Sequence, residues 1–141
     1  MSHNLIAKAS IAINASRQTV WKALVSPDAI REYMFGARVV SDWREGSPIL
    51  WKGEWQGKRY EDKGTILQVK PDRRLQYSHF SPLSGLPDKP EHYHTVTIDL
   101  AGDDTTVVTL AQDRNTSDEA RLHSEKNWKM MLEGLKKFVE Q

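Results

Sequence analysis

The sequence contains no cysteine. This absence excludes disulfide bonds, thiolate zinc sites and cysteine nucleophiles, and it fits a reducing compartment. The chain also has no apolar run long enough to span a bilayer, and its first residues, MSHNLIAKASIAI, lack the apolar core of a secretory signal. We therefore expect a cytoplasmic protein that does not insert into a membrane.

A block of charge of one sign is absent too. Twenty basic and nineteen acidic side chains give a formal net charge of +1, and the two signs are mixed along the chain. No basic run is longer than two residues, the length of Lys136-Lys137. A nucleic-acid-binding surface needs a longer basic stripe to neutralise phosphates. We therefore expect no nucleic-acid partner.

Familiar catalytic motifs and domain linkers are missing as well. The sequence has no G-x-S-x-G nucleophile elbow and no phosphate-cradling glycine loop. No repeat or low-complexity linker divides the 141 residues, of which 38% are hydrophobic and 28% charged. These values are typical of a globular domain with a substantial core. We expect a single domain over residues 1–141, without a cofactor and with little support for nucleophilic catalysis.

What is present is a change of hydrophobic period along the chain. Residues 5–13 alternate like a strand. Two short helices are predicted next, the first capped by Ser16 and the second by Ser26, with Pro27 at its first position. From Gly36 to Gln112, hydrophobic residues recur at every second position. Short breaks between these segments predict an antiparallel meander. The candidate strands are 37–43, 48–56, 60–70, 73–80, 92–100 and 105–112.

The C-terminal region predicts one long amphipathic helix. Thr116 and Glu119 have the spacing of a capping box at its start. An apolar stripe at spacings of three, four and seven follows, formed by Trp128, Met131, Leu132, Leu135, Phe138 and Val139. Only this stripe is long enough to cover one face of a six- or seven-stranded sheet. We expect an α+β fold in which a curved sheet wraps around this helix and leaves a space for side chains or a ligand.

Several motifs of one known family occur in order over nearly the whole chain. They are Ala12–Ser16 with Val20–Leu24 and Ser26–Asp28, then Asp42–Gly46, then Gly64–Pro71 with Arg74–Tyr77, and finally Trp128 with Leu132–Phe138. With them the sequence resembles the START-like (helix-grip, SRPBCC) superfamily, and more narrowly the homologues of the activator of heat-shock protein 90 ATPase. The resemblance implies a helix-grip fold with two short helices after the first strand.

The resemblance leaves the function open. The superfamily includes lipid carriers, hormone receptors, cyclases and co-chaperones, and a shared fold does not imply a shared function. The sequence also departs from the family pattern at Tyr33-Met34-Phe35, where tryptophans are common.

The strand predicted over 48–56 concentrates large rings on one face. Three of the chain's five tryptophans lie in the stretch SDWREGSPILWKGEW. Ile49, Trp51, Gly53 and Trp55 are spaced by two, so a regular strand points them all toward the helix-covered side. Trp51 and Trp55 either fill the core or line a ligand cavity, and the sequence leaves both interpretations open.

Leu75, Tyr77 and His79 alternate in the same way on a neighbouring strand. A hydroxyl and an imidazole on an apolar wall are groups that orient a ligand in a selective pocket. In the alternative interpretation, neighbouring strands or water satisfy both groups. A proton-transfer site that uses them together with Glu61 or Asp62 is a further alternative.

The predicted helix reaches the same space through Trp128 and Met131. A stripe of methionine and aromatic residues at helical spacing is also typical of ordinary core packing, so ligand contact competes with that interpretation.

Two histidines suggest a metal site only weakly. His92 and His94 would share one face of the strand predicted over 92–100, and His79 is the candidate third ligand that such a pair needs. Exposed strand histidines are the simpler explanation of the pair, so we expect no metal.

We therefore expect a carrier or stress-response protein that binds a hydrophobic small molecule, a lipid or an aromatic compound, between the sheet and the C-terminal helix. The predicted ligand-binding residues are Trp51, Trp55, Tyr77, His79, Trp128 and Met131. No residue is assigned a catalytic role. Two alternatives stay open: a cyclase- or hydrolase-like enzyme that uses the same cavity, and a co-chaperone-like module that binds a protein partner.

Overall fold

A computed structural model describes residues 5–55, 57–82 and 85–141. The elements follow each other as the hydrophobic periods predict. In chain order they are β1 (Leu5–Ile13), α1 (Arg17–Leu24), α2 (Pro27–Tyr33), β2 (Arg38–Ser41), β3 (Pro48–Trp55), β4 (Lys58–Lys70), β5 (Arg74–His79), the 3-10 helix η2 (Pro90–His92), β6 (His94–Ala101), β7 (Thr106–Asn115) and α3 (Asp118–Val139).

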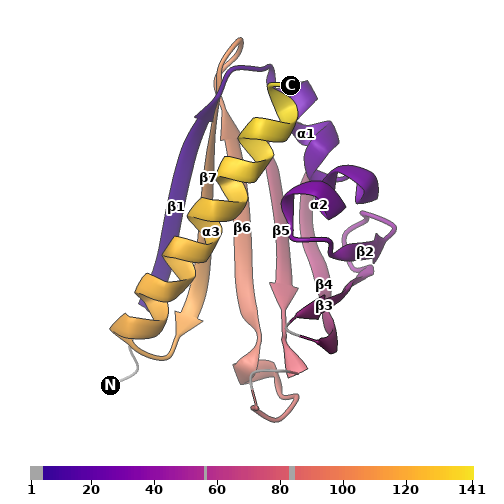
Figure 1. Ribbon diagram of the computed structural model, residues 1–141, viewed down its shortest axis with the longest axis vertical. Coiled ribbons are helices and arrows are strands. Elements are labelled where there is room, and N and C mark those ends of the chain that lie inside the picture. The colour runs from indigo at the N-terminus through magenta and orange to yellow at the C-terminus, as the bar shows by residue number, and fades with distance from the viewer. Residues whose placement is uncertain (1–4, 56, 83–84) are drawn as a thin grey trace.

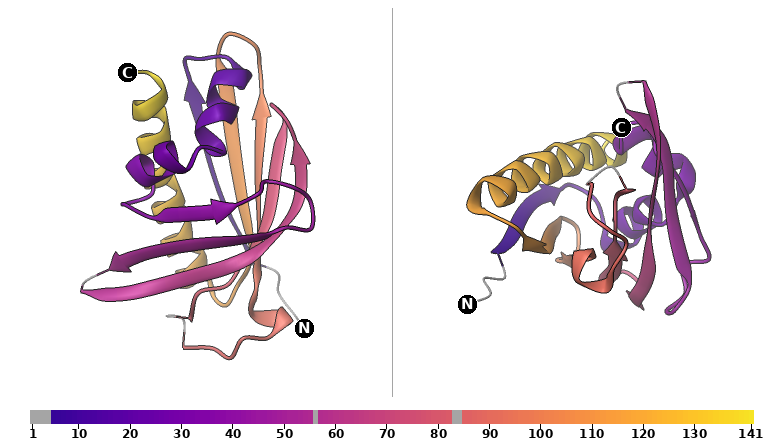
Figure 2. Two further views of the ribbon diagram at one scale, coloured as in Figure 1. Left: turned by 90° about the vertical axis from the view of Figure 1, so that its right-hand side faces the viewer. Right: turned by 90° about the horizontal axis from the view of Figure 1, so that it is seen from below.

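The strands form one seven-stranded antiparallel sheet in the order β1-β7-β6-β5-β4-β3-β2. Strands β2 to β7 therefore pair with their neighbours in sequence, and β1 adds to the β7 edge. The sheet curves around α3, and the long β3–β4 hairpin projects to one side (Figures 1 and 2). This arrangement confirms the predicted helix-grip fold, including the two short helices after the first strand.

Serine side chains begin all three α-helices. The hydroxyls of Ser16 and Ser26 accept hydrogen bonds from the backbone of Thr19 and Ala29, each at 3.3 Å, as predicted. The predicted capping box at Thr116 is wrong by one residue. Ser117 is the cap of α3 because its hydroxyl accepts from the backbone N–H of Ala120 at 3.0 Å.

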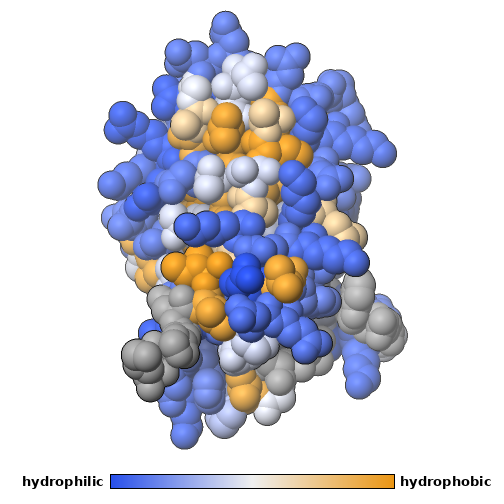
Figure 3. Space-filling view, turned by 90° about the vertical axis from the view of Figure 1, so that its left-hand side faces the viewer, coloured by the Kyte–Doolittle hydropathy of each residue, from blue (hydrophilic) through white to orange (hydrophobic). Residues whose placement is uncertain are grey.

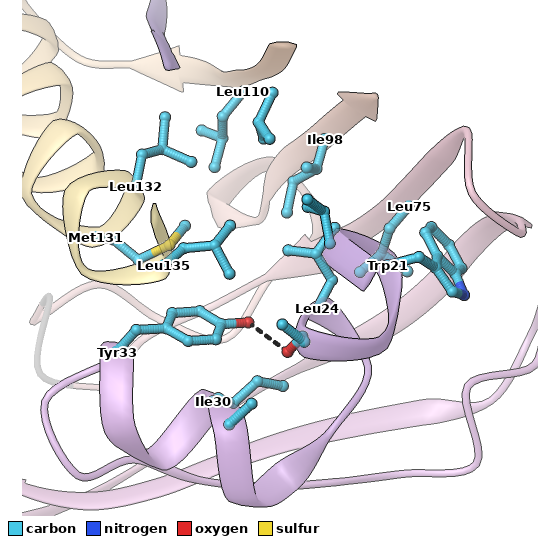
Figure 4. Packing of buried hydrophobic residues seen from close by; sticks show 14 of the residues in the cluster. Trp21, Leu24, Ile30, Tyr33, Leu75, Ile98, Leu110, Met131, Leu132 and Leu135 are labelled. Carbon is cyan, nitrogen blue, oxygen red and sulfur yellow. Dashed lines mark hydrogen bonds between the residues drawn. The ribbon is translucent and has the colours of Figure 1, made fainter. Parts of the chain in front are cut away.

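The core lies between α3 and the concave face of the sheet. Met131, Leu132 and Leu135 of α3 are buried with at most 3% of their surface exposed, and they point toward residues of β6, β7 and α1 (Figure 4). Tyr33 of α2 joins the two short helices, since its hydroxyl donates to the backbone carbonyl of Ala23 at 3.0 Å (Figure 4). The helices and the sheet thus share one apolar cluster.

The outer edge of β1 is covered by polar side chains of α3. Edge strands present unpaired N–H and C=O groups that can pair with other chains. Here the carboxylates of Glu125 in α3 and of its C-cap residue Glu140 accept from two backbone N–H groups, and two lysines of α3 donate to carbonyls. The pairs are Glu125 with Lys8 (3.0 Å), Lys129 with Ser10 (3.1 Å), Lys136 with Ala12 (2.9 Å) and Glu140 with Asn14 (2.8 Å). On this side of the molecule, hydrophilic atoms cross an apolar band (Figure 3).

The predicted histidine pair does not form on a strand. His92 ends η2, and β6 begins only at His94, so the two side chains do not share a strand face. The Nδ1 atom of His92 lies 2.7 Å from the Pro87 carbonyl, and that of His94 lies 2.8 Å from the Asp113 carbonyl. Among the residues that the structure describes, no group of three His, Asp or Glu side chains could hold a metal ion.

The helices are amphipathic rather than apolar throughout. In the described ranges, none of them combines the length and the hydropathy that crossing a bilayer requires.

Candidate functional site

The space directly beneath α3 is almost filled by the protein's own side chains. A cavity of about 20 Å³ remains there, enough for about one water molecule. Its lining residues are Leu24, Ile30, Tyr33, Met34, Trp43, Ile49, Trp51, Leu75, Tyr77, Ile98 and Met131. This part of the predicted cavity is therefore core.

A larger cleft of about 120 Å³ lies next to it. It is bounded by the chain between α2 and β2, by strands β3, β4 and β5, and by one residue of α3. Its lining residues are Met34, Phe35, Ala37, Trp51, Tyr60, Asp62, Tyr77, His79 and Trp128. The volume is below the roughly 300 Å³ at which pockets for drug-sized ligands begin.

The predicted residues divide between the two spaces. Trp51 and Tyr77 are each 5% exposed and line both of them. His79 and Trp128 line the cleft, whereas Met131 lines only the small cavity. The side chain of Trp55 lies outside the described part of the structure. Four of the six predicted residues therefore meet at the cleft.

The cleft contains a histidine–aspartate pair. The Nε2 atom of His79 lies 2.8 Å from the Oδ2 atom of Asp62, and their side chains are 25% and 16% exposed. An ionised carboxylate can only accept a hydrogen bond, so it selects the imidazole tautomer that carries its proton on Nε2. The other imidazole nitrogen, Nδ1, is then a hydrogen-bond acceptor.

Several polar atoms at the cleft have no protein partner. Within the described residues, neither His79 Nδ1 nor the Tyr77 hydroxyl makes a hydrogen bond. The Oδ1 atom of Asp62 differs, because it is buried and also lacks a partner there. Buried polar groups usually have partners, so the unpaired Asp62 Oδ1 atom at the cleft needs an explanation, and a bound molecule is one.

The His79 ring packs against the aromatic ring of Trp51. The rings of Trp51 and His79 meet edge to face with centroids 5.0 Å apart, and Trp51 and Tyr77 are tilted at the same centroid distance of 5.0 Å. On the α3 side, the indole N–H of Trp128 donates to the Oε1 atom of Gln112 on β7. The walls of the cleft are therefore fixed by contacts to the core.

Burial keeps the tyrosine hydroxyls protonated. It raises the pKa of Tyr77 far above its usual value. Burial also raises the pKa of Tyr60, and the negative charge of nearby Asp62 raises it further. Both side chains therefore present O–H donors at neutral pH.

Sequence reasoning left the partner of His79 open between Glu61 and Asp62, and the structure places Asp62 there. In the β3–β4 hairpin, Trp51 stands opposite Asp62 and Gly53 opposite Tyr60, so all four belong to the same face of the sheet. A Cβ atom on Gly53 would lie only 2.5 Å from the Tyr60 hydroxyl, so glycine makes room for that ring. The Gln56-Gly57 break between the strands was the available signal, since a two-residue hairpin loop sets this register.

The chain between α2 and β2 was missed as well. Phe35 and Gly36 both have positive φ angles, of 57° and 84°, and they turn the chain over the cleft. Phe35 is 61% exposed although it lines the cleft. The only sequence signal here was the departure from the family pattern at Tyr33-Met34-Phe35.

A curved antiparallel sheet that grips one long helix, with two short helices after its first strand and a side cleft, defines a START-like, helix-grip domain. Within this class, the sequence model of the Activator of Hsp90 ATPase homolog 1-like proteins matches residues 14–140. The chain belongs to that family.

Solved structures agree with this assignment. The Cytophaga hutchinsonii protein ChR145 is 60% identical, with a TM-score of 0.86, and the match covers 99% of this chain and 97% of that one. The Aha1 dimer from Colwellia psychrerythraea is 19% identical with a TM-score of 0.72 and 96% of both chains covered. CalU16 from Micromonospora echinospora is 23% identical, with a TM-score of 0.70 and coverages of 97% and 83%. The last two share the fold alone. No curated protein matches the chain.

Proposed function

We propose that this domain binds a hydrophobic small molecule in the cleft lined by Trp51, Tyr77, His79 and Trp128. The observation that carries the proposal is a space of about 120 Å³ with aromatic walls and with polar atoms that have no hydrogen-bond partner among the described residues. Aromatic walls supply apolar contact, and a few polar groups orient the bound molecule.

The size of the cleft favours a compound of about one ring over a lipid. A bound acyl chain needs a long apolar tunnel, but the space beneath α3 has only about 20 Å³ left. The ligand therefore binds in the cleft beside the core and does not occupy the space beneath α3. Of the two ligand types predicted from the sequence, the aromatic compound is the better supported.

The experiment is native mass spectrometry of protein purified gently from cells. We expect a co-purifying small molecule on the native chain and none on the Ala37→Leu variant. Ala37 lines the cleft and is 3% exposed, so the larger side chain fills the site. Absence of bound compounds from both proteins, together with no binding of single-ring compounds at millimolar concentration, contradicts the proposal.

A protein-interaction role is the second candidate, and family membership is the observation that favours it. The family is described by its likeness to an activator of the Hsp90 ATPase, and one structural relative is an Aha1 dimer. A stable partner in a pull-down from lysate, retained by Ala37→Leu, supports this role. Loss of the partner in that variant assigns the interaction to the cleft instead.

A further inference from the structure

We propose that the ligand of this cleft carries a neutral hydroxyl group on a single ring, as a phenol does, and that Tyr77 and His79 together bind that hydroxyl. The inference rests on the proposed small-molecule function and names its ligand class. A hydroxyl oxygen both donates and accepts hydrogen bonds. It therefore needs one acceptor and one donor from the protein.

His79 supplies the acceptor. Its Nε2 atom is 2.8 Å from Asp62 Oδ2, and the carboxylate fixes the proton on that nitrogen. The Nδ1 atom carries the lone pair and has no partner among the described residues, and the His79 side chain lines the cleft and is 25% exposed. A ligand O–H can donate to it.

Tyr77 supplies the donor. It stands two residues before His79 on β5, so both side chains leave the same face of the strand, about 6.6 Å apart along it. Its hydroxyl has no partner in the described ranges, and burial holds its pKa far above neutrality. The phenol O–H of Tyr77 can therefore donate a hydrogen bond to the ligand hydroxyl oxygen, while the same hydroxyl donates its own hydrogen to His79 Nδ1.

The charges around the cleft exclude anionic ligands. Asp62 is the one carboxylate among its nine lining residues, and none of those nine is a lysine or an arginine. A carboxylate or phosphate on the ligand would meet Asp62 without a compensating cation. Fatty acids and phospholipid headgroups are therefore poor candidates, and a neutral hydroxyl is a good one.

Asp62 acts through His79 as a positioning residue. A carboxylate at Nε2 keeps Nδ1 free of a proton, whereas an amide in its place can offer its NH₂ group to Nε2 and stabilise the opposite tautomer. The Asp62→Asn variant therefore changes the proton position with almost no change of shape. A purely structural role for Asp62 predicts no change of tautomer.

The test compares four matched ring compounds in NMR titrations of the native chain. p-Cresol carries the hydroxyl, toluene lacks it, 4-methylanisole can accept but not donate, and p-toluate is anionic. We expect p-cresol to bind with a Kd about tenfold lower than toluene and 4-methylanisole, as one to two added hydrogen bonds give. We expect p-toluate not to bind.

Two variants assign the preference to residues. Tyr77→Phe keeps the ring and is expected to raise the Kd of p-cresol about tenfold while leaving that of toluene within about twofold. Asp62→Asn is expected to remove the same preference and to shift the long-range ¹H–¹⁵N signals of the His79 ring toward the tautomer protonated at Nδ1.

The outcomes separate this inference from the proposed function. Equal binding of toluene and p-cresol overturns the hydroxyl preference and leaves small-molecule binding intact. A preference for p-cresol that survives both variants overturns the assignment to Tyr77 and His79. If no ring compound binds, the single-ring ligand and the proposed function both fail.

Discussion

Gly64 illustrates how one residue positions the candidate site. A Cβ atom at Gly64 would lie 1.7 Å from the backbone oxygen of Ser78, the residue before His79. Beside it, the Ser78 hydroxyl accepts from the backbone N–H of Thr65 at 2.9 Å, and the β4–β5 register shifts between Ile66 and Gln68. Glycine thus permits the close approach of β4 to β5 that brings Asp62 within reach of His79.

We predict that Gly64→Ala lowers the free energy of unfolding by more than about 2 kcal/mol, because the clash is with backbone and cannot relax by a rotamer change. The adjacent variant Thr65→Ala is the control, since its side chain is exposed, and a change within about 0.5 kcal/mol is expected. Urea unfolding followed by tryptophan fluorescence measures both. Similar small losses in the two variants would contradict the steric explanation.

At the scale of elements, α3 has two separate roles. Its apolar stripe fills the concave side of the sheet, and its polar side chains cover the edge of β1. The first role follows from the hydrophobic period and could be read from the sequence. The second requires knowing which strand lies beside the helix, so it emerged only from the structure.

The packing role predicts a large difference between two leucines of the same helix. Leu132 is fully buried, whereas Leu122 is 58% exposed. We expect Leu132→Ala to cost about 2–5 kcal/mol through lost burial and a new cavity. The same substitution at Leu122 should change stability by less than about 0.5 kcal/mol. Chemical denaturation of both variants under one set of conditions checks this, and comparable losses would argue against the core role of the stripe.

The edge-covering role predicts a pH dependence. The backbone N–H of Asn14, and then Lys136, lower the pKa of Glu140. In the unfolded chain the pKa is about 4.3, so the folded state favours the ionised form. The ionised Glu140 carboxylate therefore stabilises the folded state at pH values above its unfolded pKa. This stabilisation is lost as the pH falls through the lower pKa that Glu140 has in the folded state.

We therefore predict that Glu140→Gln is less stable than the native chain at pH 7, and that the difference shrinks toward zero as the pH falls below about 4. Unfolding curves measured between pH 7 and pH 3 give the comparison. Glu133→Gln on the exposed face of α3 is the control and should show no such trend. A constant difference at all pH values would assign the effect of Glu140 to something other than its charge.

At the scale of the whole molecule, a bound ligand stabilises the entire fold. The cleft joins residues from four elements, β3, β4, β5 and α3, with the segment between α2 and β2, and it does not exist in the unfolded chain. We predict that p-cresol at a hundredfold excess over its Kd raises the free energy of unfolding by about 2.7 kcal/mol. Thermal unfolding should show an upward shift for the native chain and none for Ala37→Leu. An equal shift in both proteins would place binding elsewhere.

The sequence predicted the architecture well because its signals are local. Serine caps, a period of two and the α3 stripe each depend on residues a few positions apart. The candidate site was predicted only in part, since Tyr77 and His79 follow from alternation but Asp62 depends on strand register. The size of the cleft depends on how rings from β3, β4 and α3 pack together, and no local pattern reports that volume.

The contacts between α3 and the edge of β1 also affect how this fold is made. Synthesis produces Lys8 and Asn14 more than 115 residues before their partners Glu125 and Glu140. At typical elongation rates the ribosome needs about 6 to 25 s to span that interval. During this time both edges of β1 lack their partners, since β7 is also made late. The edge of β1 can therefore be covered only after the last helix has been synthesised.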